Sequence, residues 1–92
     1  SYQSGENDQV KPDVVSYSAV INAYAKAAEF DKDCATKAMD ILNRMVKMNE
    51  GGDEDVKPNK RTYTSVINAF ARTGEAEAAD NLLIQMMYHL LH

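Results

Sequence analysis

Two stripes of residues, in which small polar side chains predominate, have the types and spacing that could bind a polar ligand. Each stripe spaces its residues three or four apart, which keeps them on one face of a helix. The stripes consist of Val15, Ser18 and Asn22, and of Arg61, Thr64 and Asn68. Hydroxyl and amide groups on an open surface can donate to and accept from the Watson–Crick edge of an unstacked base. The pattern is therefore compatible with base recognition, but by itself it favours ordinary solvated or inter-helix hydrogen-bonding residues, and the choice stays open for Asn22 and Asn68.

The chain lacks the residue patterns that catalysis or metal binding would need. Cys34 is the single cysteine, so neither an intramolecular disulfide nor a cysteine-based zinc site is expected. His89 and His92 lie three residues apart, but no carboxylate or thiol lies nearby at a matching spacing. The acidic segment 49–55 does not follow the ligand order of an EF-hand loop. We therefore expect no enzyme activity, no cofactor, no metal and no small-molecule substrate.

Charge is distributed unevenly along the chain. The formal net charge is −4, which by itself argues against nucleic acid, because phosphate binding needs local positive potential. However, residues 49–55 hold four acidic and no basic residues, whereas residues 56–73 hold four basic and no acidic residues. The second of these segments could attract phosphate. No apolar run approaches the roughly 18 residues that span a membrane, so no membrane partner is expected.

The elements that must position the polar stripes are repeated. Residues 10–26 realign on residues 56–72 at an offset of 46 residues. Each segment places apolar residues at i, i+3, i+4 and i+7, which predicts one amphipathic helix. These apolar residues are Tyr17, Val20, Ile21 and Tyr24, and Tyr63, Val66, Ile67 and Phe70. The pattern favours core packing of Tyr17 and Tyr63 over base stacking, and it places Tyr24 and Phe70 in the core.

The boundaries of the helices are also marked. Asp13 and Asn59 each follow a proline and are predicted N-caps, while Ala28 and Gly74 mark the breaks after the first helices. A second helix is predicted after each break, since a similar apolar period continues there. Its residues are Ala38, Ile41, Leu42 and Met45, and Ala79, Leu82, Leu83 and Met86.

The predicted fold is all-α. Helical hairpins at residues 10–48 and 56–92 would stack side by side as an α-solenoid, a right-handed superhelix, because one hairpin cannot cover its own apolar stripe. An acidic, flexible loop is predicted at residues 49–55 and a polar, disordered lead-in at residues 1–9. Because the chain begins at Ser1 with no initiator Met, we expect it to be a piece of a longer array.

The string Lys-Pro-Asp-Val-Val-Ser-Tyr-Ser-Ala-Val-Ile-Asn-Ala-Tyr-Ala-Lys, followed by Ala-x-x-Ile-Leu-x-x-Met, closely resembles the pentatricopeptide repeat. The second copy, Lys-Pro-Asn to Ala-Arg-Thr-Gly and then Ala-x-x-Leu-Leu-x-x-Met, resembles it again. The Trp/Leu-Gly/Tyr pattern typical of the tetratricopeptide repeat is absent. The offset exceeds the family's usual period of about 35 residues, and insertions near residues 32–36 and 50–55, both at hairpin ends, account for the excess.

The resemblance implies binding of single-stranded RNA, with one base recognised by two residues of each repeat. Here the pair is Ser18 and Asn59, which in the family leans towards adenine, and Thr64 begins the next pair. Val15 and Arg61 match the residues that sandwich bases, and Arg61 could stack its guanidinium or meet a phosphate. The residues that would contact the RNA backbone are Lys57, Lys60 and Arg72.

The resemblance also implies work in mitochondria or plastids, on transcript processing, stability or translation. A protein-interaction scaffold that uses the helical-repeat groove is the alternative, with other proteins as partners, and the net acidity and long insertions favour it. Base recognition depends on Ser18 and Thr64 facing the same open groove.

Overall fold

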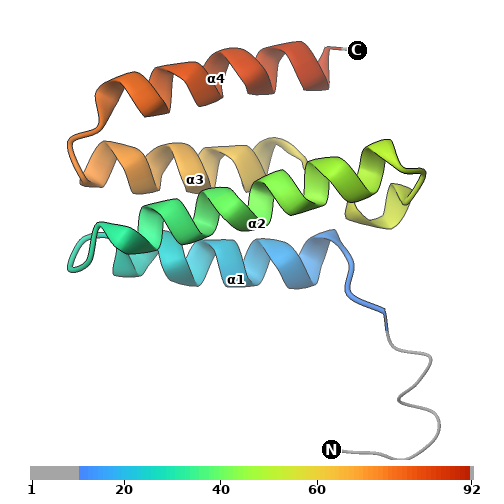
Figure 1. The fold of residues 1–92 in the computed structure, drawn as a ribbon, viewed down its shortest axis with the longest axis horizontal. Helices are drawn as coiled ribbons and strands as arrows, with labels where there is room; N and C mark the ends of the chain where they lie inside the picture. Colours follow the sequence, from blue (N-terminus) through green and yellow to red (C-terminus); the bar gives the residue numbers. More distant parts are fainter. Residues whose placement is uncertain (1–10, 92) are drawn as a thin grey trace, which may run out of the picture.

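The computed structural model of the protein describes residues 11–91, which form four α-helices and a short 3₁₀ helix (Figure 1). The elements are α1 (Val14–Ala27), α2 (Asp33–Glu50), η2 (Glu54–Val56), α3 (Lys60–Arg72) and α4 (Ala76–Leu90). None of the described residues lies in a strand, and the predicted all-α fold of helical hairpins is confirmed. The predicted disordered lead-in, residues 1–9, lies outside the described part of the chain. No helix within residues 11–91 is long and apolar enough to cross a membrane.

Both first helices begin after the predicted N-caps. Asp13 and Asn59 have extended backbones, and each side chain accepts a hydrogen bond from the backbone N–H three residues later, at 3.0 Å in both cases. The bond from the N–H of Ser16 lowers the pKa of the Asp13 carboxyl. Such a cap satisfies one of the four N–H groups that have no partner in the first turn, which stabilises a helix by about 1 kcal/mol.

Glycine ends α2 and α3 in the left-handed region of backbone space. Gly74 has a φ of +80°, and the N–H of Glu75 turns back to the carbonyl of Phe70 at 2.9 Å, which is the Schellman arrangement. Gly52, with a φ of +112°, follows α2 in the same way. The predicted break at Gly74 is confirmed, and α1 likewise ends with Ala28 as its C-cap.

The helices form two layers that share one core. α2 lies across the seam between α1 and α3 and packs against both, while α4 packs against α3 (Figure 1). The largest fully buried side chains of the core are Ile21, Leu42, Met45, Tyr63 and Val66. Buried alanines such as Ala38 and Ala69 let the helix backbones approach closely. Because both hairpins contribute to this core, each hairpin depends on the other for burial of its apolar stripe.

Val20 departs from the predicted apolar stripe of α1, because its side chain is 45% exposed. The equivalent residue of α3, Val66, is fully buried. Val66 lies one turn after Thr62, which hydrogen bonds to Ser18 of α1, so this side of α3 faces the first hairpin. The same side of α1 has no neighbouring element among residues 11–91.

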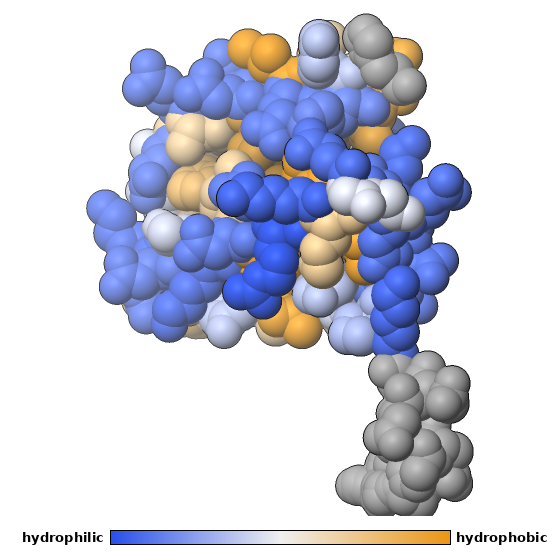
Figure 2. Space-filling model, turned by 45° about the vertical axis from the view of Figure 1, so that its right-hand side comes forward, coloured by the Kyte–Doolittle hydropathy of each residue, from blue (hydrophilic) through white to orange (hydrophobic). Residues whose placement is uncertain are grey.

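The second helices differ in how far they are covered. In α2, Ala38, Leu42 and Met45 are fully buried, as predicted. In α4, Leu82 is buried, but Leu83 of the predicted stripe is 42% exposed. The exposed large apolar residues of this helix and its end are Leu83, Ile84, Met87, Tyr88, Leu90 and Leu91. Figure 2 shows apolar surface at the upper edge of the molecule, where α4 lies. The face is uncovered because α4 packs only against α3 within the described residues.

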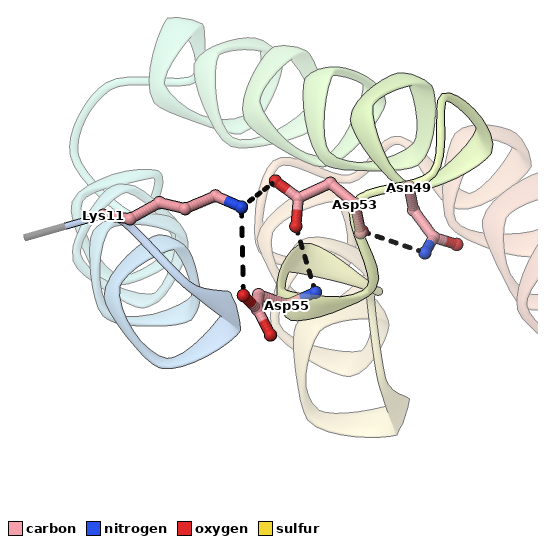
Figure 3. Close-up of polar contacts among 4 residues, drawn as sticks. All are labelled: Lys11, Asn49, Asp53 and Asp55. Carbon is pink, nitrogen blue, oxygen red and sulfur yellow. Dashed lines mark hydrogen bonds and ion pairs between the residues drawn. The ribbon is translucent and has the colours of Figure 1, made fainter.

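Asp53 organises the connection between α2 and α3 (Figure 3). Its Oδ1 accepts from the N–H of Asp55 at 3.1 Å, and its carbonyl oxygen accepts from Asn49 Nδ2 at 3.2 Å. Its Oδ2 lies 3.0 Å from Lys11 Nζ, and this hydrogen bond raises the pKa of Lys11. Segment 49–55, predicted as a flexible loop, thus includes the last two residues of α2 and the first two of η2 beside a glycine turn.

Candidate nucleic-acid interface

An open groove of about 510 Å³ lies between the first half of α1 and the start of α3. The residues that line it are Val14, Val15, Ser18, Ala19, Asn22, Asn59, Arg61 and Ser65. Four of the predicted site residues, Ser18, Asn59, Val15 and Arg61, therefore meet in one place. The volume falls in the range of roughly 300–1,000 Å³ that is usual for ligand clefts.

The groove exists because α1 and α3 pack side by side with their N-termini at the same end. Helical spacing places Val15, Ser18 and Asn22 along one face of α1, and the N-cap Asn59 approaches them from α3. The side chain of Val15 is 72% exposed. Arg61 is also exposed and takes part in no ion pair within residues 11–91. A methyl-bearing side chain and a free guanidinium thus border the same space, and each can contact the face of a flat ring.

Ser18 and Asn59 are connected through Thr62, whose side chain is fully buried. Ser18 Oγ lies 3.0 Å from Thr62 Oγ1, and Thr62 Oγ1 donates to Asn59 Oδ1 at 2.9 Å. The backbone N–H of Asn59 donates to Thr62 Oγ1 at 3.3 Å, which completes a reciprocal capping box. The three polar side chains therefore share one hydrogen-bond network that crosses from the first hairpin to the second.

Thr62 is the site residue that the sequence analysis missed. It stands three residues after the N-cap Asn59, which is the capping-box position, so its contact with Asn59 could have been predicted locally. Its contact with Ser18, 44 residues earlier in the chain, depends on the packing of α1 against α3. No local pattern gives that packing.

Thr64 is exposed on α3, but it is not among the residues that line this groove. Ser18 points towards α3, and in a repeated architecture the equivalent Thr64 points away from α1, to the side where a further hairpin would pack. Asn68 is likewise exposed and outside the groove, whereas Asn22 lines it. The expectation that Ser18 and Thr64 face one groove is therefore wrong, because equivalent residues of stacked hairpins border successive grooves. The condition that both face the same groove falls with it, and recognition of a base in this groove would depend on Ser18 and not on Thr64.

The three cations predicted to contact the RNA backbone do not form one cluster. Lys60 is exposed at the first residue of α3, beside the groove residues Asn59 and Arg61. Lys57 is exposed but borders a different hollow, of about 260 Å³, near the ends of α2 and α4. The two lysines thus serve different surfaces, and neither lines the groove itself.

Arg72 has a partner within the protein. Its Nη1 donates to the backbone carbonyl oxygen of Ala25 at 2.9 Å, in the last turn of α1. The N–H of Glu29 would complete the helical hydrogen bond to this carbonyl, but it donates to Lys26 instead. Arg72 therefore caps a free carbonyl of the first hairpin from the second, and its predicted contact with the RNA backbone stays a prediction.

The second hollow contains a buried aromatic contact. Tyr63 is fully buried, which fits its predicted place in the core, and its hydroxyl lies 2.6 Å from His89 Nδ1. Burial raises the pKa of Tyr63. No group of three or more potential metal ligands comes together within residues 11–91, and His92, considered above as a partner for His89, lies outside them.

Comparison with known families covers nearly the whole described chain. A family model described as PPR repeat family matches residues 12–72, and a second, described as PPR repeat, matches residues 61–89. No curated protein and no solved structure shows significant similarity to the chain. The first match alone spans well over half of the 92 residues and contains every residue of the groove.

Proposed function

Because the chain belongs to the pentatricopeptide repeat family, we propose that the groove between α1 and α3 holds one base of a single-stranded RNA. Proteins with these repeats are helical-repeat proteins generally involved in RNA binding, and the family is generally non-catalytic. The observation that carries the proposal is that Ser18 and Asn59, from different hairpins, line the same groove. By the family's pattern this pair favours adenine.

The walls of the groove support the placement of a flat base. Val15 and Arg61 border the groove from neighbouring helices, and both side chains are exposed. Stacking of a base on such side chains contributes about 1–3 kcal/mol and depends little on which base it is. We assign these two residues to holding the ring, and Ser18 and Asn59 to selecting it.

The charge at the start of α3 supports an anionic ligand. Lys60 and Arg61 occupy the first turn of this helix, where the helix dipole disfavours cations by about 0.3–1 kcal/mol each. The equivalent positions of α1 hold Val14 and Val15. Contact with phosphate would explain Lys60 in this unfavourable place, beside the Arg61 that borders the groove, and binding that uses these cations should weaken as salt rises.

We propose that RNA binding by this protein supports transcript processing, stability or translation in a mitochondrion or plastid. This part of the proposal is based on the family alone. An antibody raised against this chain, used on fractionated cells, tests the location. We expect the protein in an organelle fraction. Detection in the cytosol alone contradicts this part of the proposal.

A protein-interaction scaffold is the second candidate, and the exposed apolar face of α4 favours it. Leu83, Ile84 and Met87 are each more than two-fifths exposed. Apolar patches of this kind mark surfaces that bind other proteins or further units of the same fold. The scaffold candidate does not account for the polar network in the groove or for Arg61, which forms no ion pair within residues 11–91, because these residues belong to α1 and the start of α3 rather than to α4.

The test is a titration of the chain with short RNAs of uniform sequence, followed by NMR at low salt because two hairpins contact few nucleotides. We expect a preference for adenine that moves towards uracil in the double variant Ser18→Asn, Asn59→Asp. Asn43→Asp is the matched control, because it makes the same change of charge at an exposed residue of α2 outside the groove. Absence of binding, or binding that ignores base identity and both groove substitutions, would favour the scaffold.

A further inference from the structure

The network behind the groove fixes the position of every proton in it. A threonine hydroxyl has one proton and two lone pairs. Thr62 directs its proton to Asn59 Oδ1, a carbonyl oxygen that can only accept. Its lone pairs receive the backbone N–H of Asn59 and the hydroxyl of Ser18. The contact between the two hydroxyls is therefore one in which Ser18 must donate.

The amide of Asn59 is fixed in the same way. Its Oδ1 accepts from both the backbone N–H and the hydroxyl of Thr62, so the opposite amide orientation would place NH₂ against two donors. The Nδ2 group takes part in none of the hydrogen bonds formed within residues 11–91. Towards a ligand, the Ser18 hydroxyl can therefore only accept hydrogen bonds, and the Asn59 side chain can only donate them.

We propose that Thr62 is a positioning residue for base selection, which acts by holding Ser18 as an acceptor and Asn59 as a donor towards the groove. This inference rests on the function proposed above. Adenine and cytosine pair an exocyclic amino donor with a ring-nitrogen acceptor, whereas guanine and uracil pair a carbonyl acceptor with a ring N–H. If the RNA strand is held in one direction, Ser18 as acceptor and Asn59 as donor can pair with only one of these two classes of base.

The preference for adenine sets which class fits. Ser18 then accepts from the exocyclic amino group, and Asn59 donates to the ring nitrogen. In a base of the other class, a carbonyl oxygen would face the acceptor Ser18, and a ring N–H would face the donor Asn59. Polar groups that the bound base covers and leaves unpaired are costly, which is the source of the selectivity.

Hexa-adenosine and hexa-inosine are the probes that test this inference. Inosine keeps the shape of adenosine but replaces the amino group with a carbonyl and the ring nitrogen with N–H. We expect the 92-residue chain to bind hexa-adenosine about tenfold more tightly than hexa-inosine, the order of one hydrogen bond gained or left unpaired. Thr62→Val should reduce this ratio to within about twofold, because the hydroxyl of Ser18 is then free to rotate and to donate outwards.

Two further variants separate positioning from stability. Thr62→Ser keeps the hydroxyl and should retain the ratio. Thr73→Val removes another threonine hydroxyl from the opposite end of α3, where it donates to the carbonyl of Phe70, and it should lower stability without changing the ratio. If Thr62→Val leaves the ratio unchanged, with or without an equal loss of affinity for both RNAs, the inference is overturned and the proposed function still stands. Failure of the unmodified chain to bind either RNA refutes the proposed function and the inference together.

The proton positions can also be tested without RNA or variants. In the unbound chain, the hydroxyl proton of Thr62 should exchange with solvent far more slowly than that of the exposed Thr64, because Thr62 is buried and donates to Asn59. NMR measures this exchange, so the inference remains testable if Thr62→Val does not fold. Equal exchange rates for the two threonines overturn it.

Discussion

α1 and α3 have nearly the same sequence pattern, yet the structure buries different sides of the two helices. Val66 of α3 is fully buried, while nearly half of the surface of the equivalent Val20 of α1 is exposed. The order is reversed one residue later, because Ile21 of α1 is fully buried while Ile67 of α3 is only partly buried. The same residue type at the same place in a repeat thus has two different environments.

The difference comes from the neighbouring hairpin. α3 has the first hairpin against one side, and α1 has the second hairpin against the other. The burial of these valine and isoleucine positions is therefore set by the side on which the neighbouring hairpin packs. The groove follows the same rule, since Ser18 has a helix beside it that completes a groove, whereas Thr64 has no such helix among residues 11–91.

The largest test of this comparison is the isoleucine pair. Ile21→Ala should lower the free energy of unfolding by about 3 kcal/mol, because it leaves a cavity in the shared core. Ile67→Ala should cost about 1 kcal/mol, since its side chain is only partly buried. Urea unfolding followed by circular dichroism measures both values.

The valine pair is the control for the isoleucine pair, because here the substitution in the second hairpin should cost more stability than the one in the first. Val66→Ala should cost about 2 kcal/mol and Val20→Ala less than about 0.5 kcal/mol. Equal losses within either pair would mean that the hairpins do not pack as described.

The next test concerns the contact from Arg72 to Ala25, which the equivalent residue of the first hairpin, Lys26, does not make. Arg72→Met should lower the free energy of unfolding by about 1–2 kcal/mol, since it leaves a helix carbonyl without a donor. Lys26→Met at the exposed end of α1 should change it by less than about 0.5 kcal/mol. The same urea titration applies, and similar values for the two variants would remove Arg72 from the set of contacts that join the hairpins.

A smaller effect on the free energy of unfolding is expected from the cations at the start of α3, which α1 lacks. Lys60→Glu should raise the free energy of unfolding by about 0.5 kcal/mol, because an acidic residue suits the start of a helix. It should at the same time weaken RNA binding and reduce its dependence on salt. Lys47→Glu, in the last turn of α2, is the control in which the same change should destabilise the protein. A gain in RNA affinity for Lys60→Glu would argue against phosphate at the start of α3.

The smallest expected effect is a difference between the two N-caps in how their hydrogen bonds respond to pH. The pKa of Asp13 is lowered below its ordinary value of 3.8 by the hydrogen bond from Ser16, whereas Asn59 does not titrate. The contribution of Asp13 to stability is therefore complete above that ordinary value and is lost as the pH falls through the lower, folded value. NMR should show the amide of Ser16 shifting with acid while that of Thr62 stays constant below pH 4. A shift of equal size at both amides would contradict the difference between the caps.

The sequence predicts most of the fold, because caps, breaks and apolar periods are local signals. Asp13, Asn59 and Gly74 lie where they were expected to lie, and so do the core residues Tyr63 and Phe70. Features that depend on which hairpin lies beside which residue were not predicted. They are the exposure of Val20, the bond from Arg72 to Ala25, and the contact between Ser18 and Thr62.

The hydrogen bond between Ser18 and Thr62 has a consequence for engineering. It means that the polar groups which line the groove beside the first hairpin are held partly by a side chain that belongs to the second. A chimera joined at Pro58, the natural border of the repeat, would transplant Ser18 without Asn59 or Thr62. Joints placed within α3, after Thr62, would move all three together and are the better choice for exchanging specificity between arrays.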